Sequence, residues 1–203
     1  MTNRPVYFFA GGYLLLFTVC ALNPNDRTVW WAENIPIILL VAAIVASHRY
    51  HNFSPISYFF MSFLVILHTI GGHYTFERVP FSFVTEAFGF ERNHYDRLAH
   101  FSVGFFAFPI AEVLLKKRLV LSMAILVLFP IFSIFTVAGV YELFEWQYAI
   151  SAEPGAGIAV LGSQGDTWDA QKDILADGLG SIFAVAIFMY LHRAEVAQLK
   201  NIT

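Results

Sequence analysis

The sequence predicts an all-α fold, a polytopic bundle of about six transmembrane helices with both termini cytoplasmic. Hydrophobic residues make up 58% of the 203-residue chain, and charged residues only 13%. A soluble domain carries about 25% charged residues, so this chain has too little polar surface to cover a water-facing globule. The long continuous apolar runs are also unlike the alternating strands of a β-barrel. Because the chain is so apolar, we expect the lipid bilayer as a partner. Its net charge of −3 gives no reason to expect nucleic acid.

Six apolar segments are long enough, or nearly so, to cross the hydrocarbon core, which takes about 20 helical residues. They lie at roughly 6–23, 35–48, 56–76, 96–115, 119–144 and 171–192, in a single integral membrane domain spanning residues 1–203. The first segment has the form of a signal peptide, but further segments follow, so we interpret it as a retained span. Trp30 and Trp31 predict interfacial anchors before the second span. Pro109 and Pro130 predict kinks in the fourth and fifth.

Positive charges predict the orientation of the spans. With a cytoplasmic N-terminus, seven Lys and Arg residues fall on the inner side and five on the outer side. The densest cluster, Lys116-Lys117-Arg118, lies in a tight turn on the inner side. His48, His51 and His192 are expected at the same interface. The simplest location is therefore the bacterial plasma (inner) membrane, with both termini inside.

Polar residues that are costly inside a bilayer gather near the ends of four predicted spans. They form clusters at His68–Tyr74, Asn93–His100, Tyr141–Trp146 and Asp166–Gly178. With both termini inside, the third and fifth spans run outward and the fourth and sixth run inward. The ends of the first pair therefore meet the starts of the second pair. The sequence predicts one pocket, rich in acids and histidines, at the outer side.

Spacing within the clusters predicts which side chains share a helix face. Asp96 and His100 are four residues apart, and Glu142 and Glu145 are three apart. Imidazole and carboxylate groups at such spacings hold zinc, iron or manganese in helix bundles. The candidate ligands of a divalent metal ion are His68, Asp96, His100, Glu142, Asp173 and Asp177. Glu145 and Asp169 are candidates for proton transfer.

Three interpretations of these clusters remain open. They contain seven acids but only two permanent cations, Arg97 and Lys172, and neighbouring carboxylates repel strongly where the dielectric constant is low. A metal ion would relieve the repulsion, and so would protonation along a proton or ion pathway. A structural hydrogen-bonded network is the third interpretation. Asn93 and Asp166 are additionally expected to be helix N-caps.

The loop from Tyr148 to Gly165 contains the apolar, glycine-rich stretch 155–162. It is expected to be an interfacial loop, or alternatively a lid or re-entrant turn over the pocket.

Three strings carry a resemblance to a known family. They are NHYDRLAHF at 93–101, YELFEW at 141–146 and GDTWDAQKDILAD at 165–177. In this order, they make the chain similar to the YjdF-type bacterial inner-membrane proteins over nearly its whole length. The resemblance implies a multi-pass plasma-membrane protein. It implies no activity and assigns no catalytic residue.

Two functions and one non-catalytic role fit these residues. The first is a metal-dependent membrane enzyme that acts on a lipid or lipid-linked substrate near the outer leaflet. The second is a proton- or cation-coupled transporter, in which the same acids form a relay. The third is a membrane protein that only binds a partner. The inner halves of the last three spans are largely apolar, which favours a one-sided pocket over a continuous pathway.

Overall fold

The computed structural model describes residues 4–151 and 163–199, which form helices and short connections with no strand among them. The elements are α1 (Arg4–Cys20), α2 (Arg27–Ser47), α3 (Pro55–Tyr74), α4 (Ser82–Phe88), α5 (Tyr95–Val103), η1 (Gly104–Phe106), α6 (Ala107–Lys116), α7 (Met123–Ser151), η2 (Ser163–Gly165), α9 (Asp169–Leu191) and α10 (Arg193–Leu199). The all-α prediction is confirmed.

Five helical segments are long and apolar enough to cross a membrane. They are Arg27–Ser47, Pro55–Tyr74, Tyr95–Lys116, Met123–Ser151 and Asp169–Leu191. The first predicted span corresponds to α1, a shorter apolar helix of 17 residues.

The second span begins earlier than predicted, since α2 begins at Arg27 rather than at residue 35. Asp26 explains the early start, because its side chain accepts hydrogen bonds from the backbone N–H groups of Thr28 and Val29. Trp30 is only 1% exposed and packs inside the bundle, whereas Trp31 is exposed. The longer helix places Glu33 within the span.

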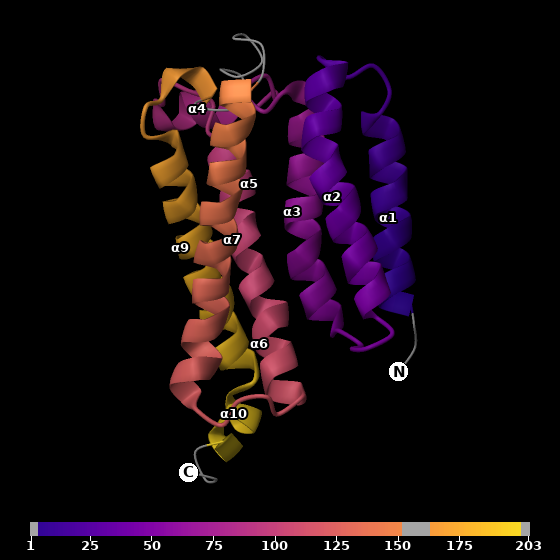
Figure 1. The fold of residues 1–203 in the computed structure, drawn as a ribbon, viewed down its shortest axis with the longest axis vertical. Coiled ribbons are helices and arrows are strands. Elements are labelled where there is room, and N and C mark those ends of the chain that lie inside the picture. Colours follow the sequence, from indigo (N-terminus) through magenta and orange to yellow (C-terminus); the bar gives the residue numbers. More distant parts are fainter. Residues whose placement is uncertain (1–3, 152–162, 200–203) are drawn as a thin grey trace.

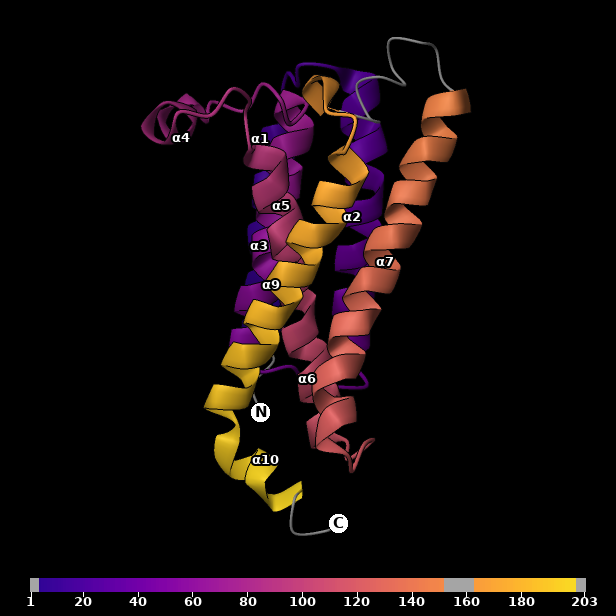
Figure 2. The ribbon, with the colours of Figure 1, turned by 90° about the vertical axis from the view of Figure 1, so that its left-hand side faces the viewer.

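The helices form two groups that lie side by side (Figure 1). In one group, α1 and α2 both pack on α3; in the other, α6 and α7 pack on α9. The groups meet where α3 packs on α5. Both ends of the described chain lie at the same end of the bundle (Figure 1). We call the opposite end, where α3 and α7 end and α5 and α9 begin, the site end; α4 extends sideways from it (Figure 2).

The fourth span is interrupted where it crosses α9. Between α5 and α6, residues Gly104–Phe106 form a 3₁₀ turn, and Pro109 has no N–H group to bond the carbonyl of Phe105. A Cβ atom on Gly104 would meet backbone atoms of α9, and one on Gly180 would meet the carbonyl of Phe101. The two backbones are therefore in contact, which small residues permit in membrane helices. This crossing brings the start of α5 beside the start of α9.

A buried carboxylate, Glu112, ties α6 to the start of α3 at the end opposite the site. It accepts hydrogen bonds from the backbone N–H of Ser54 (2.9 Å) and from Lys116 Nζ (2.8 Å). The hydroxyls of Ser54 and Ser57 also donate to it. His51, expected at the interface, lies 3.3 Å from the same carboxylate. Glu112 was not singled out from the sequence.

Candidate functional site

Side chains from five helices line one cavity at the site end, with a volume of about 230 Å³. The ionisable side chains at its surface are Glu33, His68, Asp96, His100, Tyr141, Glu145, Asp169, Asp173 and Asp177. The third to sixth spans converge here as their order predicts. The second span also contributes, which the sequence analysis did not foresee.

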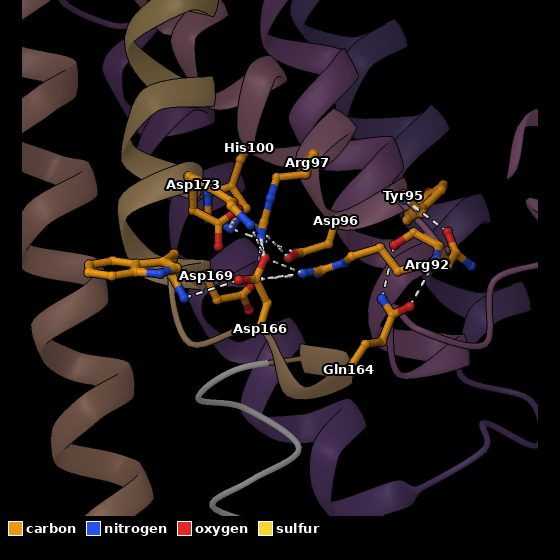
Figure 3. Close-up of polar contacts among 12 residues, drawn as sticks. Arg92, Tyr95, Asp96, Arg97, His100, Gln164, Asp166, Asp169 and Asp173 are labelled. Atoms are coloured by element: carbon orange, nitrogen blue, oxygen red, sulfur yellow. Dashed lines mark hydrogen bonds and ion pairs between the residues drawn. The ribbon is translucent and has the colours of Figure 1, made fainter. Parts of the chain in front are cut away.

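Asp96, His100 and Asp173 are the three candidate ligands that lie closest together. One oxygen or ring nitrogen from each can be chosen so that all three atoms lie within 4.8 Å of one another. His100 Nε2 is 3.7 Å from Asp96 Oδ1 and 3.6 Å from Asp173 Oδ1. The one-turn spacing of Asp96 and His100 on α5 and the crossing with α9 produce this grouping (Figure 3).

Two further acids are buried nearby, each with one oxygen that has no hydrogen-bond partner in the described part of the chain. They are Asp177, which is 1% exposed, and Glu142, which is 8% exposed. The ring nitrogen His100 Nδ1 lies 3.3 Å from Asp177 Oδ1, the oxygen without a hydrogen bond. Glu142 continues the buried stripe of α7 but does not line the cavity.

Two arginines cover the acids closest to the end of the bundle. The guanidinium of Arg97 contacts Asp96 (3.2 Å) and donates hydrogen bonds to Asp169 and Asp173. Arg92 donates to Asp169 (3.2 Å) and Asp166 (2.8 Å). Figure 3 shows both guanidinium groups among these carboxylates. The structural network proposed as one interpretation of the sequence therefore exists at this level of the site.

Asp166 lies at the edge of this network, before α9 begins. Lys172 Nζ donates to its carboxylate at 2.6 Å, and the backbone N–H of Trp168 donates at 3.0 Å. These bonds, led by that from Lys172, lower the pKa of Asp166 from 3.8 to about 2. Burial and the neighbouring Arg92 and Arg97 lower the pKa of His94, which adjoins the same network.

The expected N-caps act just outside the helices. Asn93 accepts from the N–H of Tyr95, and Asp166 accepts from that of Trp168. The residues at the N-cap positions themselves are His94 and Trp168. Asn93 also exchanges two hydrogen bonds with Gln164, which joins the starts of the two helices. Of the loop from Tyr148 to Gly165, residues 152–162 lie outside the described residues, and with them the whole glycine-rich stretch 155–162.

The opposite wall of the cavity holds His68 and Glu33. His68 Nε2 lies 3.1 Å from Glu33 Oε2, and both side chains are largely buried. His68 is therefore paired across α2 and α3 rather than grouped with Asp96, His100 and Asp173. Glu33 could have been found from the sequence, because a carboxylate inside an apolar helix is a functional signal by itself.

The two candidates for proton transfer have different surroundings. Glu145 lines the cavity and makes no hydrogen bond or ion pair with any residue that the structure describes. Tyr141 lines the cavity one turn earlier on the same face of α7. Asp169 is held by Arg92 and Arg97.

Negative charge exceeds positive charge in this region even after the structure adds Arg92. Eight acids lie in or around the cavity, namely Glu33, Asp96, Glu142, Glu145, Asp166, Asp169, Asp173 and Asp177, beside the three permanent cations Arg92, Arg97 and Lys172. If His68 and His100 were both protonated, the acids would still outnumber the cations by three.

The fold and site define a multi-pass membrane protein with an acid-rich cavity at one end of a helix bundle. The family described as "Predicted membrane protein (DUF2238)" matches residues 5–194, and the chain belongs to this family. The chain is also 30% identical over 192 residues to "Inner membrane protein YjdF" of Escherichia coli (strain K12). That match covers 94% of this chain and 90% of the relative.

These comparisons confirm the resemblance to the YjdF-type proteins and the location in a bacterial inner membrane. No solved structure matches the chain.

Proposed function

We propose that the cavity binds a divalent metal ion and catalyses a metal-dependent reaction on a membrane lipid or lipid-linked substrate. The observation that carries the proposal is the grouping of Asp96, His100 and Asp173, whose ligand atoms lie within 4.8 Å of one another. One imidazole and two carboxylates suit zinc, iron or manganese.

The surrounding residues support a metal site in two ways. Asp96 presents Oδ1 to His100 and Oδ2 to Arg97, so the arginine can orient the carboxylate without covering both oxygens. Asp177 Oδ1 is buried without a hydrogen bond and lies 3.3 Å from His100 Nδ1, and the other oxygen of this carboxylate lies 3.4 Å from the same nitrogen. A cation would offset the excess of negative charge and the cost of burying Asp177 Oδ1.

The depth of the cavity supports a lipid substrate over transport. Beyond the acids, the lining changes to Leu40, Leu64 and Val103. Still deeper, the core between α6 and α9 is apolar and includes Phe108 and Phe188. These apolar side chains cannot replace the hydration of a cation, so we interpret the site as one-sided.

In this proposal, the chain supplies ligands, a base and an orienting network. When bound, the metal ion polarises the substrate and makes a bound water more acidic. Glu145, which faces the cavity without a partner, accepts the proton released during the reaction. Asp169 holds Arg92 and Arg97 in place, and Arg97 fixes Asp96 and Asp173.

The first test is metal binding by the purified protein. After removal of metal with a chelator, wild-type protein in detergent is titrated with Zn²⁺ and Mn²⁺, and bound metal is measured by elemental analysis. We expect one ion per chain, with affinity about 100-fold or more weaker in Asp173→Asn and His100→Gln. Glu91→Gln removes an exposed acid at the same end that does not line the cavity, so it should bind as wild type does. Wild-type protein that binds neither ion would overturn the proposal.

A further inference from the structure

The cavity is amphipathic along the direction of the helices. Most of its acids lie in the first turns from the site end and Asp177 lies two turns into α9, while the apolar side chains on α2 and α7 lie about two turns deeper than the acids of those helices. Leu40 follows Glu33 by seven residues on α2, and Val137 precedes Glu145 by eight on α7, so each lies about 10–12 Å deeper. Leu64 and Val103 complete the apolar part from α3 and α5. Such a cavity is shaped for a molecule with one polar and one apolar end.

The side of the cavity between α2 and α7 differs from its inner wall. Both helices line it, but they belong to different groups of the bundle, and in the described chain they do not pack against each other as a helix pair (Figure 1). Val137 lines the cavity and is nevertheless 58% exposed. It therefore lies at a margin where the cavity wall becomes the outer surface. By contrast, Leu64 is buried, 8% exposed, on the inner wall.

We propose that the cavity opens sideways between α2 and α7 and admits one hydrocarbon chain of a membrane amphiphile. The chain lies against Leu40, Leu64 and Val137, and its polar end reaches Asp96, His100 and Asp173. The volume of about 230 Å³ is below the roughly 300–1,000 Å³ of most small-molecule sites, so it suits one chain rather than two. This inference rests on the proposed function and makes it more specific. The site recognises one hydrocarbon chain, either that of a single-chain amphiphile or one chain of a lipid.

The burial of apolar groups drives chain entry only where water is displaced. In a membrane, a chain leaves other lipid chains and enters an apolar wall, so affinity depends on close packing and on the polar end. A larger side chain at Val137 should therefore block entry of the hydrocarbon chain. The same substitution at a position that faces lipid should not. Val140 provides the matched position, because it is on the same helix, 61% exposed, and does not line the cavity.

The test uses a lysophosphatidylcholine that carries a photoactivatable diazirine in its acyl chain. Full-length protein is reconstituted in dioleoylphosphatidylcholine vesicles, illuminated and mapped by mass spectrometry. We expect label on Leu64 and Val103. Val137→Trp should reduce this label by about tenfold, which corresponds to a loss of about 1.4 kcal/mol of packing with the bound chain. Val140→Trp should leave it unchanged, and the smaller Val137→Phe should give an intermediate loss.

Each outcome separates this inference from the proposed function. Wild-type label confined to lipid-facing residues such as Leu143 and Phe144 would overturn the lateral opening. Label at Leu64 that Val137→Trp leaves intact would also overturn it. The experiment is run on metal-free protein and again with Mn²⁺. Chain labelling without metal binding would support the opening and count against the metal site.

Discussion

At the scale of single residues, the arrangement around Arg97 shows how several carboxylates can share a bilayer-spanning region. Its guanidinium contacts Asp96, Asp169 and Asp173, which come from two helices. A guanidinium suits this role because it remains charged and offers five donors in a rigid plane. Asp177 lies deeper than these pairs and, among the described residues, forms no ion pair with Arg92 or Arg97; His100 Nδ1 lies 3.3 Å from its Oδ1.

Asp166 provides a test of the outermost network through pH. Its pKa is about 2 in the folded protein against 3.8 ordinarily. A lowered pKa means that its stabilising bonds are fully present above pH 3.8 and are lost as the pH falls through about 2. We expect the melting temperature of wild-type protein in detergent to exceed that of Asp166→Asn at pH 5, and the difference to shrink toward pH 2. A difference that grew on acidification would contradict this assignment.

Glu112 provides a test at the other end of the bundle. Glu112→Ala leaves Ser54, Ser57 and Lys116 without their buried acceptor, and we expect it to lower the free energy of unfolding by about 3 kcal/mol. Unfolding can be followed by titration with sodium dodecyl sulfate. Glu112→Gln should cost less, and the exposed Glu195→Ala should have little effect. Equal stability of Glu112→Ala and wild type would show that this network adds nothing.

The sequence was sufficient to predict that the acids meet, but not how they pair. The order of the helices brings α5, α7 and α9 together at one end whatever their packing. The pairing of His68 depends on Glu33, which was missed because the second span was started after Trp30 and Trp31. Glu112 was missed because its partners, such as Ser54, belong to a distant segment. Both acids lie within apolar helices, where any carboxylate is a reason for closer attention.

At the scale of the helices, the crossing of α9 with α5 and η1 fixes the site. Gly104 and Gly180 allow backbone contact there, and Tyr95 supports α5 from the other side by donating its hydroxyl proton to the carbonyl of Leu67 (2.9 Å). Two small residues of α9, Gly178 and Gly180, closely follow the candidate ligand Asp177 in the sequence. The sequence did not reveal that Gly104 would be their counterpart, because the contact depends on the 3₁₀ turn.

Replacing Gly180 tests the crossing. Gly180→Ala places a methyl group against the carbonyl of Phe101, and we expect it to lower stability by about 1–3 kcal/mol because neither backbone can yield. Gly139 is the matched control: a Cβ there meets nothing within 4 Å. Gly139→Ala should therefore be neutral, or stabilising by about 0.5–1 kcal/mol. Thermal unfolding in detergent compares the two, and similar stabilities would argue against a tight crossing.

At the scale of the whole molecule, two groups of helices enclose the cavity at one end of the bundle. The group of α1, α2 and α3 has its own apolar core, as does the group formed around α6 and α9. They are joined through α3 and α5, and the cavity lies where they separate. Basic residues gather at the opposite end, in Lys116-Lys117-Arg118 and at Arg193. This asymmetry predicts that the cavity opens on the outer side of the membrane.

Cysteine labelling of intact cells tests that orientation. The chain has one cysteine, Cys20, which is buried and can be replaced by alanine. In that background, Glu91→Cys and Lys117→Cys introduce exposed thiols at the two ends of the bundle. A membrane-impermeant maleimide should label position 91 in intact cells, and position 117 only after permeabilisation. The reverse pattern would invert the orientation.

The contact between Gly104 and Gly180 also acts as a pivot. Asp96 lies eight residues from Gly104, and Asp173 lies seven from Gly180, so each carboxylate sits on an arm about 10–12 Å long. A change of about 5° in the crossing angle would move the tips by about 1 Å, a displacement that can cost about 100-fold in a reacting site. Bilayer thickness and lateral pressure change helix tilt. They would therefore displace the carboxylates before they measurably changed the stability of the protein.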